Sequence, residues 1–263
     1  MMPTISEQGD VSPDDVDPTP SQGAALLEIR DVSVRFGGVH ALEGVTFGVP
    51  AGSLTGLIGP NGAGKSTLID AICGVVPASG VVVFEGHDLR GLRPHVRARR
   101  GLARVFQSGE LCDDLTVLEN VVVGPFRSRR RRADHARDVL QRLQLDADAD
   151  RHVDELSTGR RRLVAIARAL AQEPRLLLLD EPAAGLDSRE SDWLGQQLIA
   201  VRDSGVTIVM IEHDLQLLMR ICDHLHVLNF GRLIASGPPA VVARHPEVVA
   251  AYLGGAHVAA EPA

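Results

Sequence analysis

The sequence predicts an α/β fold in which a mostly parallel β-sheet is covered by helices. Hydrophobic residues make up 44% of the 263 residues but aromatic residues only 3%, so the core must be built from Leu, Val, Ala and Ile. The four leucines at 176–179 fit a strand buried on both faces, as in a parallel sheet. A short apolar strand, a glycine-rich loop and a helix follow one another over residues 54–73. The length suits one such domain with an inserted subdomain.

The elements are predicted in chain order from their own patterns. Residues 26–36 alternate apolar and polar side chains, which predicts a strand, and 41–49 is predicted as its partner in an N-terminal antiparallel β region. Helical periodicity between about 108 and 158 predicts an inserted helical subdomain. The other predicted strands are 54–58, 81–84, 175–180, 206–211, 225–228 and 233–235, and the other predicted helices are 66–73, 163–171, 190–201, 215–222 and two short ones within 239–253.

The two ends of the chain differ from its centre in composition. Residues 1–23 contain five acidic side chains, four prolines and no basic side chain, which predicts a disordered acidic tail. The same composition excludes a secretion signal in this segment. We expect the folded domain to span 24–254 and a flexible C-terminal tail to span 255–263.

Charge and composition narrow the possible partners. The formal charge of −7 argues against nucleic acid as the principal partner. No apolar run approaches the roughly 18 residues needed to span a bilayer, so a membrane role must be peripheral. Three scattered cysteines suggest a reducing compartment without a disulfide framework. These are Cys73, Cys112 and Cys222.

The glycine-rich loop contains the single lysine among 27 basic residues. Because all the other basic residues are arginines, this lysine indicates a position that needs a slim ammonium group and could not hold a broad guanidinium. The loop has the pattern G-x-x-x-x-G-K-[ST], in which backbone N–H groups point at nucleotide phosphates, the lysine reaches the β- and γ-phosphates and the following hydroxyl binds Mg²⁺. A helix N-terminus directly after the loop favours the same anion. We therefore predict nucleoside triphosphate binding by Gly59, Pro60, Asn61, Gly62, Ala63, Gly64, Lys65, Ser66 and Thr67.

Two further strands end in side chains suited to phosphate chemistry. Asp180 and Glu181 follow the four-leucine strand, at the edge where open α/β sheets place their ligands. Asp180 is predicted to hold the Mg²⁺ bound by Ser66, while Glu181 is predicted to orient or deprotonate the attacking water. His213 follows the next strand and can reach a γ-phosphate from there.

These residues resemble the nucleotide-binding subunits of ABC transporters over about residues 26–254. The resemblance implies a P-loop NTPase core of the ABC-ATPase type, with ATP and Mg²⁺ as cofactors. It also implies that Phe36 stacks on adenine and that Gln107 senses Mg²⁺ and faces a membrane partner. Asp187, in the segment 185–187, matches the loop that crosses a dimer. Glu181 matches the catalytic carboxylate.

The signature loop of that family, normally Leu-Ser-Gly-Gly-Gln, is Leu-Ser-Thr-Gly-Arg here, at 156–160. Ser157 and Gly159 are retained and are expected to bind the γ-phosphate held by an opposite subunit. Thr158 narrows the space for close backbone approach. We expect Arg160 to add positive charge near that phosphate and to alter the closed geometry.

Several segments resemble the ATPases that drive uptake of branched-chain and other hydrophobic amino acids, and this resemblance sets the expected partners. The segments are 182–187, 211–214, 227–231 and 251–254. Expected partners are integral membrane permease subunits, a second ATP-binding subunit in a homo- or heterodimer and, indirectly, a solute-binding protein. The expected location is cytoplasmic, peripheral on the inner face of the cell membrane. Related systems carry urea or short amides, and the lipopolysaccharide-export ATPase is a neighbouring family.

Two alternatives to a transport motor stay open on the sequence. One is a non-transport ABC-type ATPase that acts on DNA, ribosomes or cofactor assembly, although the chain has neither a long coiled coil nor tandem cassettes. The other is a regulatory nucleotide-binding module, which the unusual signature favours and the intact Glu181 and His213 disfavour.

Three other clusters are interpreted as structural rather than as sites. The arginine-rich run at 127–132 is most simply a solvated surface, with anionic lipid headgroups or an acidic partner loop as alternatives. The acidic segment 146–150 has a calcium-loop spacing at its start but lacks the required glycine and glutamate. A zinc site at Cys222, His224 and His226 would lack a fourth ligand nearby in the sequence.

Overall fold

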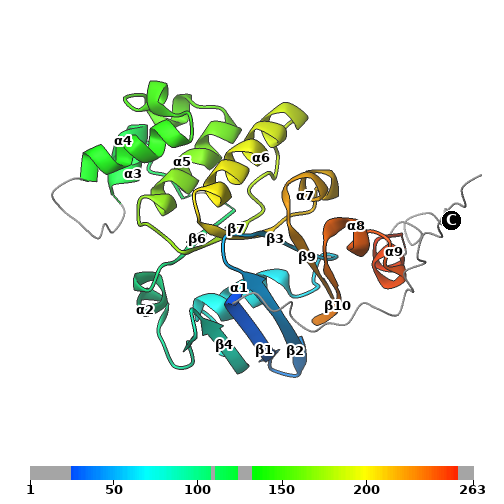
Figure 1. The fold of residues 1–263 in the computed structure, drawn as a ribbon. Helices are drawn as coiled ribbons and strands as arrows, with labels where there is room; N and C mark the ends of the chain where they lie inside the picture. The colour runs from blue at the N-terminus through cyan, green and yellow to red at the C-terminus, as the bar shows by residue number, and fades with distance from the viewer. Residues whose placement is uncertain (1–24, 108–109, 124–131, 254–263) are drawn as a thin grey trace, which may run out of the picture.

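The computed structural model describes residues 25–107, 110–123 and 132–253 (Figure 1). The predicted tails at 1–23 and 255–263 lie outside the described residues, as does nearly all of the arginine-rich run. Within the described ranges, none of the helices is long and apolar enough to cross a membrane.

A six-stranded sheet forms the centre of the fold. Its order is β10-β9-β3-β8-β7-β6, and β3, β6, β7, β8 and β9 run parallel while β10 pairs antiparallel to β9. Crossovers through helices separate the parallel strands in sequence, as parallel pairing requires. The strand bounds are β3 Leu54–Ile58, β6 Leu102–Val105, β7 Leu176–Asp180, β8 Thr207–Ile211, β9 His224–Asn229 and β10 Arg232–Gly237.

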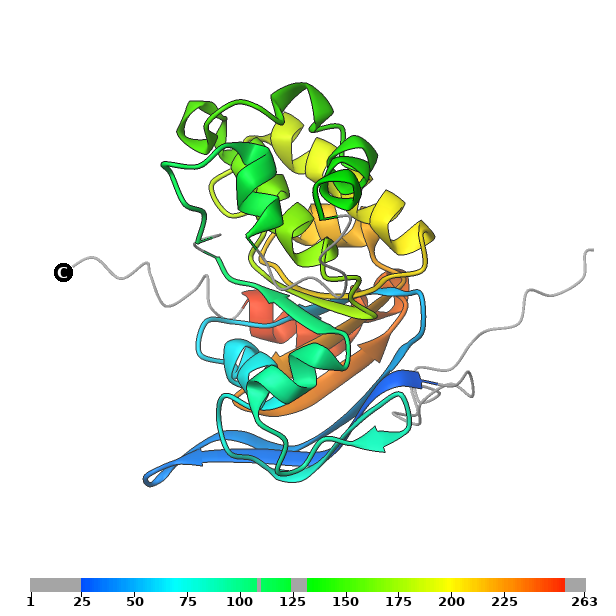
Figure 2. The same cartoon turned by 90° about the vertical axis from the view of Figure 1, so that its left-hand side faces the viewer.

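A four-stranded sheet lies on one side of the parallel sheet, in the order β2-β1-β4-β5 and with antiparallel pairing throughout (Figures 1 and 2). Its strands are β1 Ala25–Phe36, β2 Val39–Pro50, β4 Ser79–Phe84 and β5 His87–Asp88. Helix α1, Lys65–Cys73, lies between the two sheets. The predicted N-terminal antiparallel region therefore corresponds to β1 and β2, with β4 and β5 added to it.

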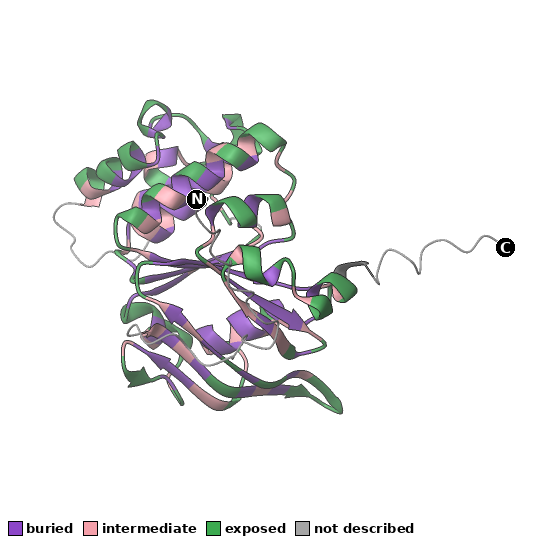
Figure 3. Cartoon of the chain, turned by 45° about the vertical axis from the view of Figure 1, so that its right-hand side comes forward, coloured by how far each residue is buried: buried purple, intermediate pink, exposed green. Residues whose placement is uncertain are grey.

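The leucines of β7 explain why this strand is central. Leu176 and Leu178 belong to the hydrophobic core shared with α1 and the antiparallel sheet, while Leu177 and Leu179 belong to the core beneath the helices on the other face. All four are 0–1% exposed. Figure 3 shows the same distribution, with buried residues filling the parallel sheet and the helix surfaces turned toward it. The prediction of a strand buried on both faces is confirmed.

Helices cover the outer face of the parallel sheet (Figure 1). Between β6 and β7 the chain forms α3 Val117–Val122, α4 Arg132–Arg142, two short 3₁₀ segments, η1 Asp146–Asp148 and η2 Val153–Glu155, and α5 Thr158–Leu170. The other helices are α2 Pro94–Arg99, α6 Ser188–Asp203, α7 Leu215–Ile221, α8 Pro239–Val242 and α9 Pro246–Leu253.

Polar caps fix where the site-bearing helices begin. Asp187 accepts from the backbone N–H groups of Arg189 and Glu190 at the start of α6, and Asp214 caps α7 in the same way. Ser157 caps α5, so this helix begins at Thr158 rather than at the predicted residue 163. The earlier start has a physical cause, because a serine at the N-cap satisfies an otherwise unpaired N–H of the first turn.

Candidate functional site

The glycine-rich loop connects β3 to α1 and leaves no room for side chains at two of its positions. At Gly59, a Cβ atom would lie 2.1 Å from the carbonyl oxygen of Leu228, and φ is +147°. At Gly64, the N-cap of α1, a Cβ atom would lie 2.6 Å from the carbonyl oxygen of Ala41, and φ is +103°. Close backbone packing therefore requires glycine at both positions.

Lys65 lies inside this loop, with only 6% of its surface exposed. Its Nζ donates hydrogen bonds to the carbonyl oxygens of Gly59 at 2.8 Å and Pro60 at 3.0 Å. Burial lowers the pKa of the ammonium, and the charges of Glu181 and Asp180 offset part of that effect. The Lys65 ammonium is thus bound only by neutral carbonyl oxygens in this loop. A charged phosphate oxygen is a stronger acceptor and can replace them.

The openness of the loop allows an anion to approach. Asn61, Gly62 and Ser66 are exposed, and Thr67 is half-buried. Ala63 is buried in the hydrophobic core that α1 shares with the antiparallel sheet, so it anchors the loop. Helix α1 has no acidic side chain in its first turn, so nothing on the helix itself opposes an anion there.

Glu181 is the meeting point of the segments that follow three parallel strands. Its Oε2 accepts a hydrogen bond from Nε2 of Gln107 at 2.9 Å, and its Oε1 lies 2.7 Å from Nε2 of His213. Gln107 follows β6, Glu181 follows β7 and His213 follows β8. The structure therefore brings together three residues that the sequence predicted separately.

The backbone of Glu181 is strained. Its φ of +48° lies in the left-handed region, which a residue with a side chain rarely adopts. A backbone hydrogen bond from Glu181 N–H to the carbonyl oxygen of Ile211, at 3.0 Å, helps to hold this conformation. Strain of this kind persists where surrounding contacts over-determine the backbone, which is common at functional sites.

Asp180 is tied to a residue that the sequence analysis missed. Nη2 of Arg104 donates to Oδ2 of Asp180 at 3.2 Å, and Nη1 of the same arginine donates to Oδ1 of Asp70 at 2.5 Å. The guanidinium also lies over the ring of Phe106, 4.3 Å from its centroid. An arginine within the apolar segment 103–106 was the available signal, but its two carboxylate partners are 34 and 76 residues away.

Glu212 is a second missed residue. It is 4% exposed, and its Oε1 accepts the backbone N–H of Ala183 at 2.6 Å while its Oε2 accepts that of His213 at 3.0 Å. Burial raises the pKa of its carboxyl, and these backbone N–H groups work against that rise. The side chain joins the turn after Glu181 to the end of β8, so it fixes the relative position of Glu181 and His213.

A second group of predicted residues lies at the first turns of α5 and α6. Ser157 is the exposed N-cap of α5, and Asp187 is the exposed N-cap of α6. Gly159 is buried against Glu190, whose Oε1 would lie 3.2 Å from a Cβ at that position. Within the described ranges, no hydrogen bond or ion pair joins these residues to the loop at 59–67. Phe36, at the end of β1, is 52% exposed.

The expected contact of Arg160 with a phosphate held by an opposite subunit stays a prediction. In this structure its guanidinium does not stand as an unpaired charge beside Ser157, because it forms an ion pair with Asp148 of the same chain. The same contact bears on the calcium interpretation of 146–150, because Asp148 is occupied by Arg160 and Arg151.

No group of three or more potential metal ligands occurs in the described part of the chain. His226 lies in the interior, where its ring stacks on Phe47 at 4.1 Å between centroids. Burial raises the pKa of the Cys222 thiol, which keeps it protonated and disfavours its use as a thiolate ligand. The zinc interpretation gains no support.

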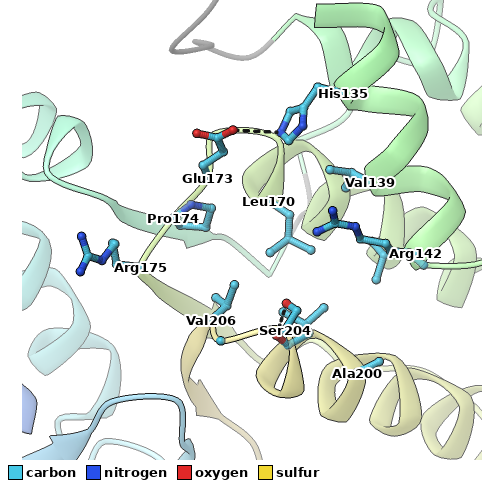
Figure 4. Close-up of a pocket in the computed structure, with 13 residues that line it drawn as sticks. His135, Val139, Arg142, Leu170, Glu173, Pro174, Arg175, Ala200, Ser204 and Val206 are labelled. Atoms are coloured by element: carbon cyan, nitrogen blue, oxygen red, sulfur yellow. Dashed lines mark hydrogen bonds and ion pairs between the residues drawn. The ribbon is translucent and has the colours of Figure 1, made fainter. Parts of the chain in front are cut away.

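A cavity of about 670 Å³ opens elsewhere, between α4, the turn from α5 to β7 and the end of α6 (Figure 4). His135 and Glu173 face each other across its rim, 3.8 Å apart, and Val139 and Leu170 line its interior. None of the residues predicted for nucleotide binding lines this cavity.

Comparison with known families decides the classification. A model of the ABC transporter family matches residues 42–184, and a model of the branched-chain amino acid ATP-binding cassette transporter matches residues 232–258. The chain belongs to the ABC transporter family. It is an ATP-binding cassette, and like the ATPases of this family it hydrolyses ATP as the motor subunit of a transporter.

Individual relatives support this assignment over most of their length. The high-affinity branched-chain amino acid transport ATP-binding protein BraF of Pseudomonas aeruginosa is 36% identical over 249 residues, which cover 87% of this chain and 98% of BraF. The corresponding LivG protein of Escherichia coli is 35% identical with the same coverage. Both are therefore matched nearly end to end.

Solved structures agree with the fold. The ADP conformation of an ATP-binding cassette of an ABC transporter superimposes with a TM-score of 0.79 at 33% identity, covering 88% of this chain and 99% of that one. A dimeric bacterial ABC transporter cassette superimposes with a TM-score of 0.69 at 27% identity, covering 81% and 98%. The predicted α/β fold with an ABC-ATPase core is confirmed.

Proposed function

We propose that this ABC ATPase drives the uptake of branched-chain amino acids or closely related amides through separate membrane subunits. The cargo class rests on the family match at 232–258, because that segment is described for branched-chain amino acid cassettes in particular. The names of BraF and LivG point the same way. The motor chemistry rests on the single observation that Gln107, Glu181 and His213 meet at the end of β7.

In the proposed mechanism Glu181 is the catalytic carboxylate. It orients the attacking water and accepts its proton, while His213, which pairs with Oε1 of Glu181 in this structure, moves to the γ-phosphate when ATP binds. The backbone of residues 59–67 cradles the phosphates, and Lys65 exchanges its loop carbonyls for phosphate oxygens. Phe36, exposed at the end of β1, stacks on the adenine ring.

The residues present fit a magnesium ion. Ser66 offers an exposed hydroxyl, Asp180 a carboxylate, and Gln107 an amide oxygen whose NH₂ group is already engaged with Glu181. These oxygen donors are the kind that Mg²⁺ prefers. When bound, the ion would neutralise charge on the β- and γ-phosphates. Arg104 donates a hydrogen bond to Asp180 and so helps to hold its side chain in place.

Two copies are needed to complete each ATP site in this proposal. Ser157, Gly159 and Asp187 lie on α5 and α6 and make no hydrogen bond or ion pair with the phosphate loop within the described ranges. They would act on the nucleotide held by a second ATP-binding subunit, identical or related. The superposition on a dimeric cassette supports this arrangement.

The remaining partners follow from the transporter role. Integral membrane permease subunits would carry the solute, and a solute-binding protein would deliver it to them. The cassette would sit in the cytoplasm, peripheral on the inner face of the membrane. The net charge of −7 fits the absence of nucleic acid from this list.

The proposed function is tested by isolating the ATP-bound protein together with the proteins that bind it. The Glu181→Gln protein is tagged, loaded with ATP and recovered from detergent-solubilised native membranes, and its partners are identified by mass spectrometry. Permease subunits should copurify, and a strain without this chain should lose leucine uptake that the native protein restores and Glu181→Gln does not. Recovery of soluble or nucleic-acid-binding partners without any permease would refute the transport role. Intact leucine uptake in the deletion strain would refute the cargo.

A further inference from the structure

Arg160 departs from the usual signature residue, and the structure shows where its charge goes. Its Nη1 donates to Oδ2 of Asp148, and its guanidinium centre lies 5.4 Å from the centroid of the Trp193 ring. The Arg160 side chain remains 41% exposed. The positive charge is therefore held at the surface of the first turn of α5 by one ion pair and one cation–π contact.

Asp148 has a second arginine that stays in place if Arg160 leaves. Its side chain is 6% exposed, and Oδ1 accepts from Nη1 of Arg151 at 2.8 Å. Arg151 is itself anchored to the Glu155 side chain at 3.2 Å and to its carbonyl oxygen at 3.0 Å. A buried carboxylate without a partner destabilises the protein strongly. Because Arg151 stays paired with Asp148, the release of Arg160 requires much less free energy than the separation of a simple ion pair.

The first turn of α5 has two features that favour an anion, although the carboxylates of Asp148 and Glu190 lie beside it. Ser157 caps the helix and accepts the backbone N–H of Arg160 at 3.4 Å, and the first turn of α5 carries no acidic residue. The helix N-terminus adds its own partial positive charge. Trp193 belongs to α6, the helix that Asp187 caps, so the Arg160–Trp193 contact also connects the two helices whose N-termini face a second subunit in the proposed dimer.

We propose that Arg160 is a further phosphate-binding residue, stored against Asp148 and Trp193 in the single cassette. Closure of two cassettes around ATP moves it from Asp148 to the phosphates held by the opposite cassette. A triphosphate carries more negative charge than the one carboxylate that Arg160 and Arg151 share, so the exchange favours the closed state. Asp148 is then a positioning residue. This inference rests on the proposed ATP-driven dimer.

The test uses Trp193 as a reporter, because it is the single tryptophan of the chain. In the full-length Glu181→Gln protein, ATP is titrated while dimerisation is followed by sedimentation and the environment of Trp193 by its fluorescence emission. Asp148→Asn and Arg160→Gln are added to this parent. Arg161→Gln is the matched control, because Arg161 is the next residue and pairs with Asp113 instead.

The two test variants should move in opposite directions. Asp148→Asn weakens the stored state, so the ATP concentration for half-maximal dimerisation should fall by roughly fivefold, whereas Arg160→Gln should raise it by roughly fivefold. In the parent, Trp193 emission should change in step with dimerisation. In Arg160→Gln the ATP-free emission should already differ from the parent, and the ATP-dependent change should shrink. Arg161→Gln should match the parent throughout.

Several results would overturn the inference. If Asp148 and Arg160 form a permanent brace, both variants weaken dimerisation and the ATP-dependent change of Trp193 emission persists without Arg160. If Asp148→Asn does not fold, as judged by circular dichroism, Arg160→Lys takes its place as the deciding variant. The proposed exchange predicts that lysine restores part of the ATP-dependent dimerisation that Arg160→Gln loses. A permanent brace that needs the guanidinium predicts no such rescue. A parent that binds ATP without dimerising would instead refute the proposed function, and this inference with it.

Discussion

Acidification should destabilise this cassette through one buried histidine. His226, on β9, is 3% exposed, stacks on Phe47 and places Nδ1 2.9 Å from Oγ of Ser236. Burial lowers its pKa to about 3, and a hydrogen bond with the backbone of Gly48 offsets part of that effect. The folded protein therefore keeps the imidazole neutral at pH values where an exposed histidine is protonated.

The magnitude follows from the two pKa values. An unfolded histidine titrates near ~6.5, so between that pH and about 3 the unfolded chain binds a proton that the folded chain does not. Stability is then fully present above the unfolded pKa and falls as the pH drops through this window. Linkage gives a loss of about 2 kcal/mol in the free energy of unfolding between pH 7 and pH 5.

Urea unfolding of the native chain and of His226→Asn, each at pH 7 and pH 5, measures this contribution. Asparagine can keep a polar contact with Ser236, and any constant cost of the substitution cancels when only the pH-dependent loss is compared. The native chain should lose about 2 kcal/mol more than the variant over this pH range. Equal losses in the two proteins, within about 0.5 kcal/mol, would refute the assignment to His226.

Four further substitutions test the site and its frame. Lys65→Arg should abolish ATP binding, measured by calorimetry, because the buried loop encloses an ammonium and has no space for a guanidinium. His213→Ala should lower kcat for ATP hydrolysis by roughly 100-fold and leave nucleotide affinity nearly unchanged, which steady-state kinetics would show. Gly59→Ala should lower the melting temperature, because its Cβ would lie 2.1 Å from a carbonyl oxygen. Arg104→Met should cost about 3 kcal/mol in urea unfolding, because Asp70 and Asp180 lose their shared cation, and Asp70→Asn added to it should restore part of that loss.

The fold was largely predictable because the strands can be identified from their local sequence patterns. The four leucines of β7 and the alternation in β1 and β2 follow directly from burial on two faces and on one face. The start of α5 was misplaced, because the apolar spacing becomes visible only at residue 163, whereas the helix begins at the cap supplied by Ser157. Hydrophobic periodicity thus locates the buried part of a helix better than its exposed first turn.

The candidate site was predictable where a motif brings chemistry into a short stretch, and not where the contact spans the chain. The loop at 59–67 and the pair Asp180–Glu181 carry their own pattern. Arg104 and Glu212 act through partners that only the strand order β3-β8-β7-β6 brings near them. Arg160 shows the same limit, since its sequence position indicated a charge at the signature turn but not the carboxylate that binds it.

With the roles proposed above, the strained conformation of Glu181 links ATP hydrolysis to the binding of ATP at the site. A left-handed glutamate costs about 1–3 kcal/mol, and here its side chain is held by Gln107 and His213. Both of these residues are also proposed to contact the nucleotide or its metal ion. ATP binding therefore competes with the carboxylate for Nε2 of His213, while the NH₂ group of Gln107 stays on Glu181 and the backbone remains fixed through Ile211 and Glu212. Oε1 of Glu181 becomes available to water when the γ-phosphate has taken over His213, so without ATP the catalytic base stays paired with His213.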